Sequence, residues 1–467
     1  MRAIIPAALL ATVNAVHLTP NQLNTVWEHA VRMSNFSWEN GTIGETWLEW
    51  KYPHLSVFSS TAPLPLPDLT PDQVPEIMQL AEDTLANRPV NFTNPALPTN
   101  ISATGANASS TSEGGLRRRQ TPTSVPVPTA STSTATSSTP LLVPLAANSQ
   151  LPHGQPLLED GAAGDPASLG VTVLVADKAS SGTLIKGVSF MQAAQSQVDY
   201  LLYGVPRNEQ GAISHRAATF QLWADNVYMV PPFLAYFGAI TNNQTLLQTA
   251  FDQISAYRQG LQDPETKLWR HMSPGPEAED PNLWATGNAW AAAGILRVLA
   301  TIKRSQFAEG MGDQVTQLQV WAAEILGASK EYMTHDGLLR NYINNASDFV
   351  DAAATALMAS AGLRMATLNL TNDHVDAATK MLAGASRNVN STGYLTNVTD
   401  PYSFHQPGTV SPEGNAFVVL GYAAYNDWEK MGKPGNTRGK DPLSGAGRAG
   451  ASLVGVLLAV GVGVAAM

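Results

Sequence analysis

One carboxylate, Asp225, lies in the stretch QLWADNVYMVPPF (221–233), whose other residues are mostly apolar or aromatic. A charged carboxylate is costly to remove from water unless it is paired or takes part in chemistry. Trp223 lies two residues before it. The local sequence therefore leaves two interpretations of Asp225 open, a paired structural acid or a functional one.

The segments near this stretch are rich in polar and aromatic residues. One carries His215 and leads to Trp223, and the next carries Trp269 and His271. Two further stretches read LWATGNAW (283–290) and YSFHQPGTVSPEGNAF (402–417). Aromatic rings stack on sugar faces, while imidazoles and carboxylates hydrogen-bond to hydroxyls. These segments favour an oligosaccharide as the ligand.

Structural roles compete with function at several of these positions. A tryptophan at helical spacing is usually a core residue, so Trp290 and Trp321 could be only that. A single histidine is usually structural, which is how we interpret His335 and His405.

The sequence SPEGNAF is also typical of an ordinary helix start. Ser411 would be the N-cap, Pro412 would occupy the first position, and Glu413 would lie in the first turn. Asn345 and Asn397 belong to glycosylation sequons, so attached glycans compete with any role in a pocket.

Composition excludes several kinds of chemistry. The 467 residues include no cysteine, so thiolate catalysis and disulfides are impossible. The histidines form no HxxxH or HExxH pair, and GxSxG and phosphate-loop motifs are absent. We therefore expect no metal and no cofactor. A formal net charge of −10 argues against nucleic acid as a partner.

The elements that must position these residues are helices. Apolar residues recur at helical spacing through most of the chain, and strand signals are scarce. Helices are predicted near 20–34, 44–58, 72–87, 166–177, 188–202, 222–239, 247–257, 288–304, 315–325, 348–366, 375–385 and 412–430.

Short and long connections alternate between the later helices. The long ones lie near 204–222, 261–288, 328–348 and 388–412. Alternate connections in a row of antiparallel helices lie at the same end, so the long loops should share one rim.

The long loops also repeat internally. Gly211, Lys267, Gly337 and Gly393 correspond, at steps of 56, 70 and 56 residues, and the fourth residue beyond each is His215, His271, Asn341 and Asn397. A helical hairpin recurring at this length and closed into a ring predicts an all-α fold, an (α/α)6 barrel of six hairpins.

Both ends and one internal stretch predict an extracellular protein. Residues 1–15 read as a signal peptide, 16–92 as the first barrel helices, 93–150 as a disordered Ser/Thr/Pro-rich insert, 151–432 as the rest of the barrel, and 433–467 as a linker and GPI-anchor signal. A membrane span is the alternative for the apolar tail. Arg117–Arg119 is either a processing site or a solvated basic spot.

Sequons support secretion. They lie at Asn35, Asn40, Asn91, Asn100, Asn107, Asn243, Asn345, Asn369, Asn390 and Asn397. We expect a monomer that meets the membrane only through the anchor.

Taken in order, AISHR, QLWADNVYMVPPFLAYFG, LWRH, LWATGNAWAAAGILRVL and SPEGNAF resemble the signatures of family 105 glycoside hydrolases, the unsaturated rhamnogalacturonyl hydrolases, which are related to family 88. The resemblance covers about residues 165–428. It implies a six-hairpin barrel and a hydrolase that protonates C4 of a C4=C5 double bond in a non-reducing uronyl residue. Water then adds at C5, and the resulting hemiketal opens.

The resemblance also implies residue roles. Asp225 would be the general acid and base, with a pKa raised by its aromatic surroundings. Asp165 would be the second acid, although a helix N-cap is the alternative there. The implied substrate-binding residues are His215, Trp223, His271, Trp284, Asn288 and Trp290. Where the family has an arginine this chain has Thr286, which weakens carboxylate recognition.

Two other functions stay open. A six-hairpin mannanase of the family 76 type would need adjacent aspartates, and the chain has no Asp-Asp pair. A non-catalytic glycan-binding protein on the same scaffold would be consistent with Thr286.

Overall fold

The computed structural model describes residues 17–61, 64–95, 154–180, 182–275, 279–436 and 443. The expected signal peptide, nearly all of the Ser/Thr/Pro-rich insert with Arg117–Arg119, and nearly all of the expected linker and anchor signal lie outside these residues. Among the described residues, no helix is long and apolar enough to cross a membrane.

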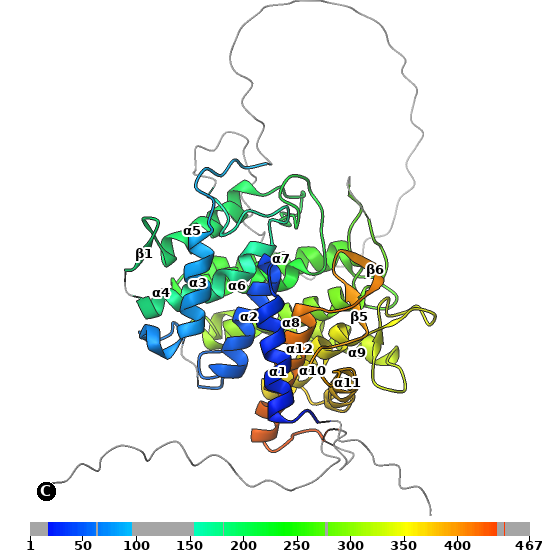
Figure 1. Ribbon diagram of the computed structural model, residues 1–467. Coiled ribbons are helices and arrows are strands. Elements are labelled where there is room, and N and C mark those ends of the chain that lie inside the picture. Colours follow the sequence, from blue (N-terminus) through cyan, green and yellow to red (C-terminus); the bar gives the residue numbers. More distant parts are fainter. Residues whose placement is uncertain are drawn as a thin grey trace, which may run out of the picture. The chain divides into compact units, whose positions relative to one another are not determined.

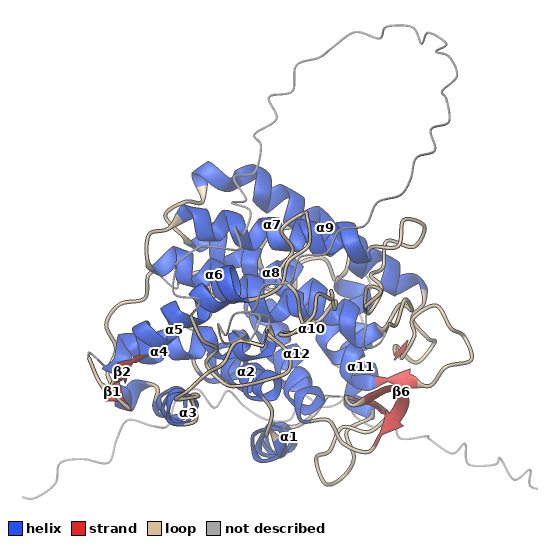
Figure 2. Cartoon of the chain, turned by 90° about the horizontal axis from the view of Figure 1, so that it is seen from above, coloured by secondary structure: helices blue, strands red, loops and turns tan. Residues whose placement is uncertain are grey.

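Twelve α-helices make up most of the described chain (Figures 1 and 2). They are α1 (Pro20–Met33), α2 (Ser37–Thr46), α3 (Pro75–Ala86), α4 (Gly170–Ser180), α5 (Phe190–Asp199), α6 (Asn226–Ile240), α7 (Gln244–Leu261), α8 (Ala285–Arg304), α9 (Gly312–Glu331), α10 (Ala352–Thr367), α11 (Val375–Arg387) and α12 (Pro412–Lys430). The predicted all-α class is confirmed.

Short elements complete these helices. A 3-10 turn, η3 (Asp165–Leu169), leads into α4, and π-helical turns extend α2 and α5 at η1 (Trp47–Lys51) and η4 (Tyr200–Gly204). The described loops contain three two-stranded antiparallel ribbons: β1 (Leu184–Ile185) with β2 (Val188–Ser189), β3 (Leu339–Arg340) with β4 (Val350–Asp351), and β5 (Val398–Asp400) with β6 (Ser403–Gly408). The helix predicted near 44–58 was displaced, because α2 begins at Ser37 and its π turn ends at Lys51.

The even-numbered helices form a closed inner ring. In the order α2, α4, α6, α8, α10, α12 each packs on the next, η3 bridges α2 to α6, and α12 packs back on α2. The odd-numbered helices lie outside, as α7 does on α6, α9 on α8 and α11 on α10 (Figure 2). Helices α6, α8 and α10 are buried on nearly all sides, whereas α7 and α9 bury only one face. This is the predicted (α/α)6 barrel.

The sequence repeat corresponds to a repeated loop geometry. Gly211, Lys267, Gly337 and Gly393 all have positive φ, at 80°, 68°, 80° and 87°. A glycine is the natural residue in this left-handed region, and Lys267 is the exception. Each reverses the chain so that the residues after it run back toward the inner ring.

Backbone hydrogen bonds then connect neighbouring repeats. The carbonyls of the four residues at the next repeat position, His215, His271, Asn341 and Asn397, accept the N–H groups of Ala163, Ala224, Ala285 and Ala352 at 2.6, 2.8, 2.7 and 2.8 Å. Each of these alanines lies at or just before the start of an inner helix or of its 3-10 turn. The repeated position therefore lies beside the amino ends of the inner helices, on one rim.

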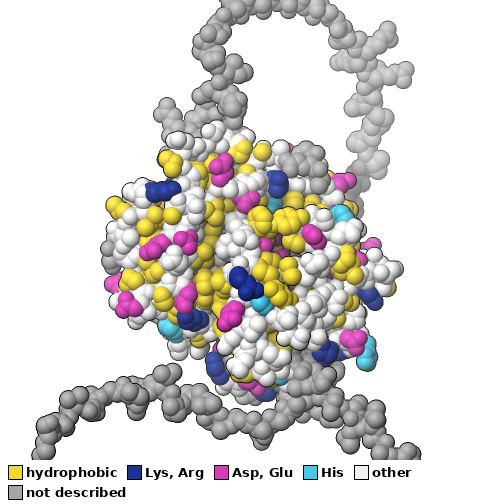
Figure 3. Space-filling view, viewed as in Figure 1, with side chains coloured by type: hydrophobic (Ala, Val, Ile, Leu, Met, Phe, Trp, Pro, Cys, Tyr) yellow, Lys and Arg dark blue, Asp and Glu magenta, His cyan; other side chains and the backbone are white. Residues whose placement is uncertain are grey.

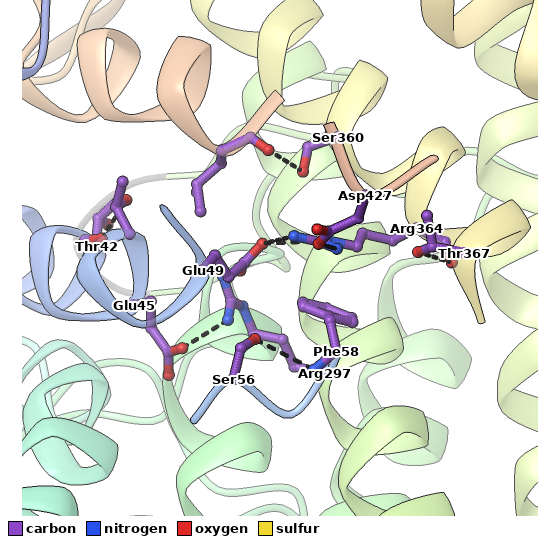
Figure 4. Close-up of polar contacts among 12 residues, drawn as sticks. Thr42, Glu45, Glu49, Ser56, Phe58, Arg297, Ser360, Arg364, Thr367 and Asp427 are labelled. Atoms are coloured by element: carbon purple, nitrogen blue, oxygen red, sulfur yellow. Dashed lines mark hydrogen bonds and ion pairs between the residues drawn. The ribbon is translucent and has the colours of Figure 1, made fainter. Parts of the chain in front are cut away.

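Deeper in the barrel, buried charges tie the inner helices together (Figure 4). Arg297 of α8 pairs with Glu45 of α2 and with Glu49 of the π turn. Arg364 of α10 pairs with the same Glu49 at 2.9 Å and with Asp427 of α12 at 2.7 Å. The Phe58 ring lies against both guanidinium groups. Because every charge here is paired, the network can be buried, and it fixes four inner-ring elements relative to one another.

Candidate active site

A cavity of about 380 Å³ opens at the amino ends of the inner helices. Five inner helices and η3, the 3-10 turn that leads into α4, each contribute a residue from their start to the wall: Trp38, Asp165, Asp225, Thr286, Ala353 and Glu413. The amino ends of five helices and of this turn therefore converge on one space. Their aligned peptide dipoles favour negative charge there.

Asp225 occupies the N-cap position of α6 and lines this cavity. Its Oδ1 atom is buried without a hydrogen-bond partner and lies 3.9 Å from Nε2 of His271. Burial raises the pKa of Asp225. A carboxyl group with a raised pKa beside an open cavity can hold a proton and deliver it, which is the task of a general acid.

His271 does not lie on the cavity wall, although the sequence suggested a substrate contact. Its side chain is buried behind Asp225, and its Nδ1 lies 3.0 Å from Oδ2 of Asp280. The same Oδ2 accepts the hydroxyl of Tyr342 at 2.8 Å, and Oδ1 accepts the side-chain amide of Asn282 at 2.7 Å. The imidazole is thus held from the side away from Asp225.

Asp165 also lines the cavity, from the start of η3. The residue before it, Gly164, takes the N-cap position, so the alternative that Asp165 is only a helix cap is wrong. Burial raises the pKa of Asp165 well above its usual range, and the charges of Asp160 and Asp225 add to this. Its Oδ1 lies 3.9 Å from Nδ1 of His215.

His215 lies flat against the Trp223 ring, with centroids 4.7 Å apart and an interplanar angle of 23°. Burial lowers the pKa of His215 to about 3, helped by the adjacent Arg216 charge, so the imidazole is neutral. Both His215 and Trp223 line the cavity, as the sequence suggested.

Aromatic side chains form much of the remaining wall. Trp284 and Trp290 line it, and so do Phe36, Trp38 and Tyr402 at the more exposed side. Trp290 also packs on Phe417 and Tyr228, so it serves both the core and the site. Trp321 stacks on Phe251 between outer helices and is the core residue that its spacing suggested. His335 and His405 are exposed and do not line the cavity; His335 lies beside Asp336 and His405 against the Phe404 ring.

Two residues from LWATGNAW have structural partners. Asn288 does not line the cavity, because its amide bonds the backbone of Trp269 and the carbonyl of Trp284. The suggested substrate contact through Asn288 is therefore not what the structure shows. Thr286 does line the cavity, but its hydroxyl donates to Asp351 at 2.6 Å.

The sequence missed Glu413 as a site residue. The expected helix start is correct, with Ser411 capping the Gly414 N–H and Pro412 in the first turn. Glu413 nevertheless lines the cavity, and its Oε2 is buried without a partner. Burial, and then the charges of Glu39 and Asp351, raise the pKa of Glu413 to about 7. The sequence did contain a signal for this role. Glu413 is the second residue of α12, just as Thr286, which also lines the cavity, is the second residue of α8.

The lining also contains one basic residue, Arg216, whose guanidinium carbon lies 5.8 Å from the Trp223 ring centroid. Within the described part of the chain, no three His, Asp or Glu side chains are grouped to hold a metal ion. Acids, a neutral imidazole, aromatic rings and one guanidinium make this a site for acid–base chemistry on a sugar-like ligand.

Comparison with known proteins agrees with this geometry. Residues 185–404 match the family model described as Glycosyl Hydrolase Family 88. Over 202 residues the chain is 23% identical to an unsaturated rhamnogalacturonyl hydrolase of Bacillus subtilis, a match covering 42% of this chain. This chain therefore spans 56%, about half, of that relative's length.

Solved structures with a similar chain course include two from bacteria. One is a possible family 105 member from Salmonella enterica, with TM-score 0.49 and 19% identity over 56% of this chain and 70% of that one. The other is an unsaturated glucuronyl hydrolase from Bacillus sp. GL1, with TM-score 0.43 and 16% identity over 55% and 72%. The matches to the family 88 model and to the Bacillus subtilis relative confirm the resemblance noted in the sequence motifs.

Proposed function

We propose, from the premise that this chain is related to the family 88 and 105 glycoside hydrolases, that it hydrolyses oligosaccharides ending in an unsaturated uronyl residue. The observation that carries the proposal is Asp225, a buried carboxyl group with a raised pKa on the wall of an aromatic cavity. The N-terminal ends of five helices and of η3 around the same cavity favour the anionic uronyl group.

The reaction needs one group that gives a proton and takes one back. Asp225 protonates C4 of the C4=C5 double bond, which forms the C4–H bond and leaves positive charge at C5 and the ring oxygen. Water attacks C5 and returns its proton to the Asp225 carboxylate. The resulting hemiketal opens and releases the remaining saccharide. Asp165, on the neighbouring inner-ring element, lies close enough for the Asp225 charge to raise its pKa, and it assists from that wall.

A rhamnogalacturonyl-type substrate is the finer proposal, and the Bacillus subtilis relative supports it. Trp223, Trp284 and Trp290 offer faces for the sugar rings, and Arg216 adds a positive charge to the wall that attracts a uronyl carboxylate. The intact acid site favours an enzyme over a non-catalytic glycan-binding protein.

The test is to incubate the protein with lyase-treated rhamnogalacturonan and to follow the ultraviolet absorbance of the conjugated uronate. We expect the absorbance to fall with the wild type and with the exposed control Asp313→Asn. Asp225→Asn should lower kcat by about 10²- to 10⁴-fold, the usual contribution of a general acid. Saccharide binding by the wild type without loss of absorbance would instead support the glycan-binding alternative.

We also propose that the enzyme acts outside the cell, held at the surface by the expected GPI anchor. Among the eight sequon asparagines in the described residues, all but Asn40 are exposed and so accessible to glycosylation. The face in Figure 3 carries scattered charged side chains and no large basic cluster. Release of the protein from cells by a phosphatidylinositol-specific phospholipase, and a mass loss on deglycosylation, would test the proposal. Retention in the cytosol would contradict it.

A further inference from the structure

Four polar side chains lie in a row that runs from the cavity into the protein. Asp225 is on the wall, His271 is behind it, and Asp280 and then Tyr342 follow. The three steps measure 3.9, 3.0 and 2.8 Å. The activity described above uses Asp225 directly, and nothing in it yet requires Asp280.

The hydrogen bonds around Asp280 decide which nitrogen of His271 carries the proton. Burial raises the pKa of Asp280, but hydrogen bonds from His271, Tyr342 and Asn282 outweigh it and lower the pKa overall. An ionised carboxylate can only accept hydrogen bonds. The His271 nitrogen next to Asp280, Nδ1, must therefore donate, and in the neutral ring Nε2 is left without a hydrogen.

That bare nitrogen faces the proposed general acid. Nε2 of His271 and Oδ1 of Asp225 are both buried, and neither has a hydrogen-bond partner. They lie 3.9 Å apart, beyond hydrogen-bond length. Catalytic hydrogen bonds are often long before substrate binds and shorten in the complex.

We propose that Asp280 is a positioning residue: it accepts the Nδ1–H of His271 and so fixes the tautomer whose bare Nε2 receives the Asp225 proton as a hydrogen bond. This inference rests on the proposed function, because the protonated form of Asp225 that the hydrogen bond stabilises is the form that starts the hydration reaction. Asp280 touches neither substrate nor the reacting atoms and acts through His271.

Other charged groups near this row have to be included in its pH dependence. Asp165 and His215 face it from the start of η3 and from the loop before α6, and Tyr257 faces Asp225 from α7. Asp280 and Tyr342 approach from the other side. With Asn at position 280, its amide can donate to Nδ1. Nε2 then carries the hydrogen, donates to the Asp225 carboxylate, stabilises its charged form and lowers the pKa of Asp225.

The experiment compares Asp280→Asn with the wild type on lyase-treated rhamnogalacturonan across pH. We expect kcat to fall about tenfold or more, KM to change less than about twofold, and the alkaline limb of kcat to move to lower pH. Asp280→Glu keeps a carboxylate acceptor and should recover part of kcat. Glu279→Gln, an exposed neighbour, is the matched control and should behave as wild type.

Nitrogen NMR of histidine-labelled protein gives a readout that does not depend on turnover. The wild type should contain a His271 resonance with hydrogen on Nδ1 only, assigned by its loss in His271→Gln. In Asp280→Asn the hydrogen should move to Nε2.

Three outcomes would overturn the inference. In the first, the hydrogen is already on Nε2 in the wild type. In the second, Asp280→Asn loses stability or activity with an unmoved pH profile, which would make Asp280 merely structural. In the third, the wild type does not turn over the substrate, which removes the proposed function and this inference with it.

Discussion

Glu413 lies across the cavity from Asp225. Their helices, α12 and α6, are three positions apart in a closed ring of six, and both residues lie at the start of their helix. Two acids that line the same cavity therefore face each other from opposite walls. Burial raises the pKa of both, that of Glu413 to about 7.

Glu413 should make substrate binding depend on pH. Below about pH 7 the carboxyl group is neutral and can donate a hydrogen bond to a bound uronyl group, and above it the carboxylate repels that anion. We expect the wild-type KM to rise above pH 7, approaching about tenfold per pH unit. Glu413→Gln should remove this rise, whereas the exposed control Glu265→Gln should keep it. Parallel KM profiles in wild type and Glu413→Gln would contradict the assignment.

The same carboxyl group should affect stability. Its pKa is raised from 4.5 to about 7 in the folded protein, so its contribution is fully present below pH 4.5 and is lost as pH rises through 7. Glu413→Gln does not titrate. The free energy of unfolding of the variant minus that of the wild type should therefore be about 3 kcal/mol larger at pH 8 than at pH 4.5. Urea denaturation at both pH values measures this, and a pH-independent difference would contradict it.

The buried charge network should be a major source of stability. Glu49 accepts from both Arg297 and Arg364, so Glu49→Gln leaves two buried guanidinium groups with incomplete compensation. We expect a loss of about 3 to 5 kcal/mol in the free energy of unfolding. Arg270→Gln breaks a more exposed pair with Asp263 and should cost about 1 kcal/mol or less. Equal losses in the two variants, measured by chemical denaturation, would argue against the network.

The repeated loop residue can be tested at the position that departs from glycine. Lys267 is exposed and has a φ of 68°, so Lys267→Gly should relieve backbone strain and stabilise the protein by up to about 1 kcal/mol. Gly337→Ala should do the opposite, by about 1 to 3 kcal/mol, since its new Cβ would lie 2.4 Å from the Lys380 carbonyl oxygen. Thermal unfolding of both variants decides this, and a destabilised Lys267→Gly protein would refute the strain argument.

Most of the fold could be predicted because its signals are local and repeated. The 3.6-residue spacing predicted twelve helices, and alternating connection lengths placed the long loops on one rim. The spacing of Gly211, Lys267, Gly337 and Gly393 located a turn that the structure repeats with the same sign of φ. Asp225 stood out because a lone acid in apolar surroundings is costly wherever the chain places it.

The partners of these residues could not be predicted in the same way. Asp280 lies in a part of its loop that the repeat does not include, and it meets His271 only because the chain turns back there. The side chain of Asn288 is of a type that often binds ligands, yet its amide hydrogen-bonds to the backbone of Trp269. Glu413 fits a helix start equally well whether or not it faces a cavity.

The sequence by itself determined the helices, the alternation of short and long connections between them, and the unusual position of Asp225. Helical period and desolvation cost both depend on neighbours only a few residues away. Only the tertiary structure decided which side chains face one another. Closing six hairpins into a ring brings Asp225 and Glu413 to opposite walls of one cavity and places Asp280 behind His271. Such contacts depend on the closure of the whole barrel, which no single segment of the chain encodes.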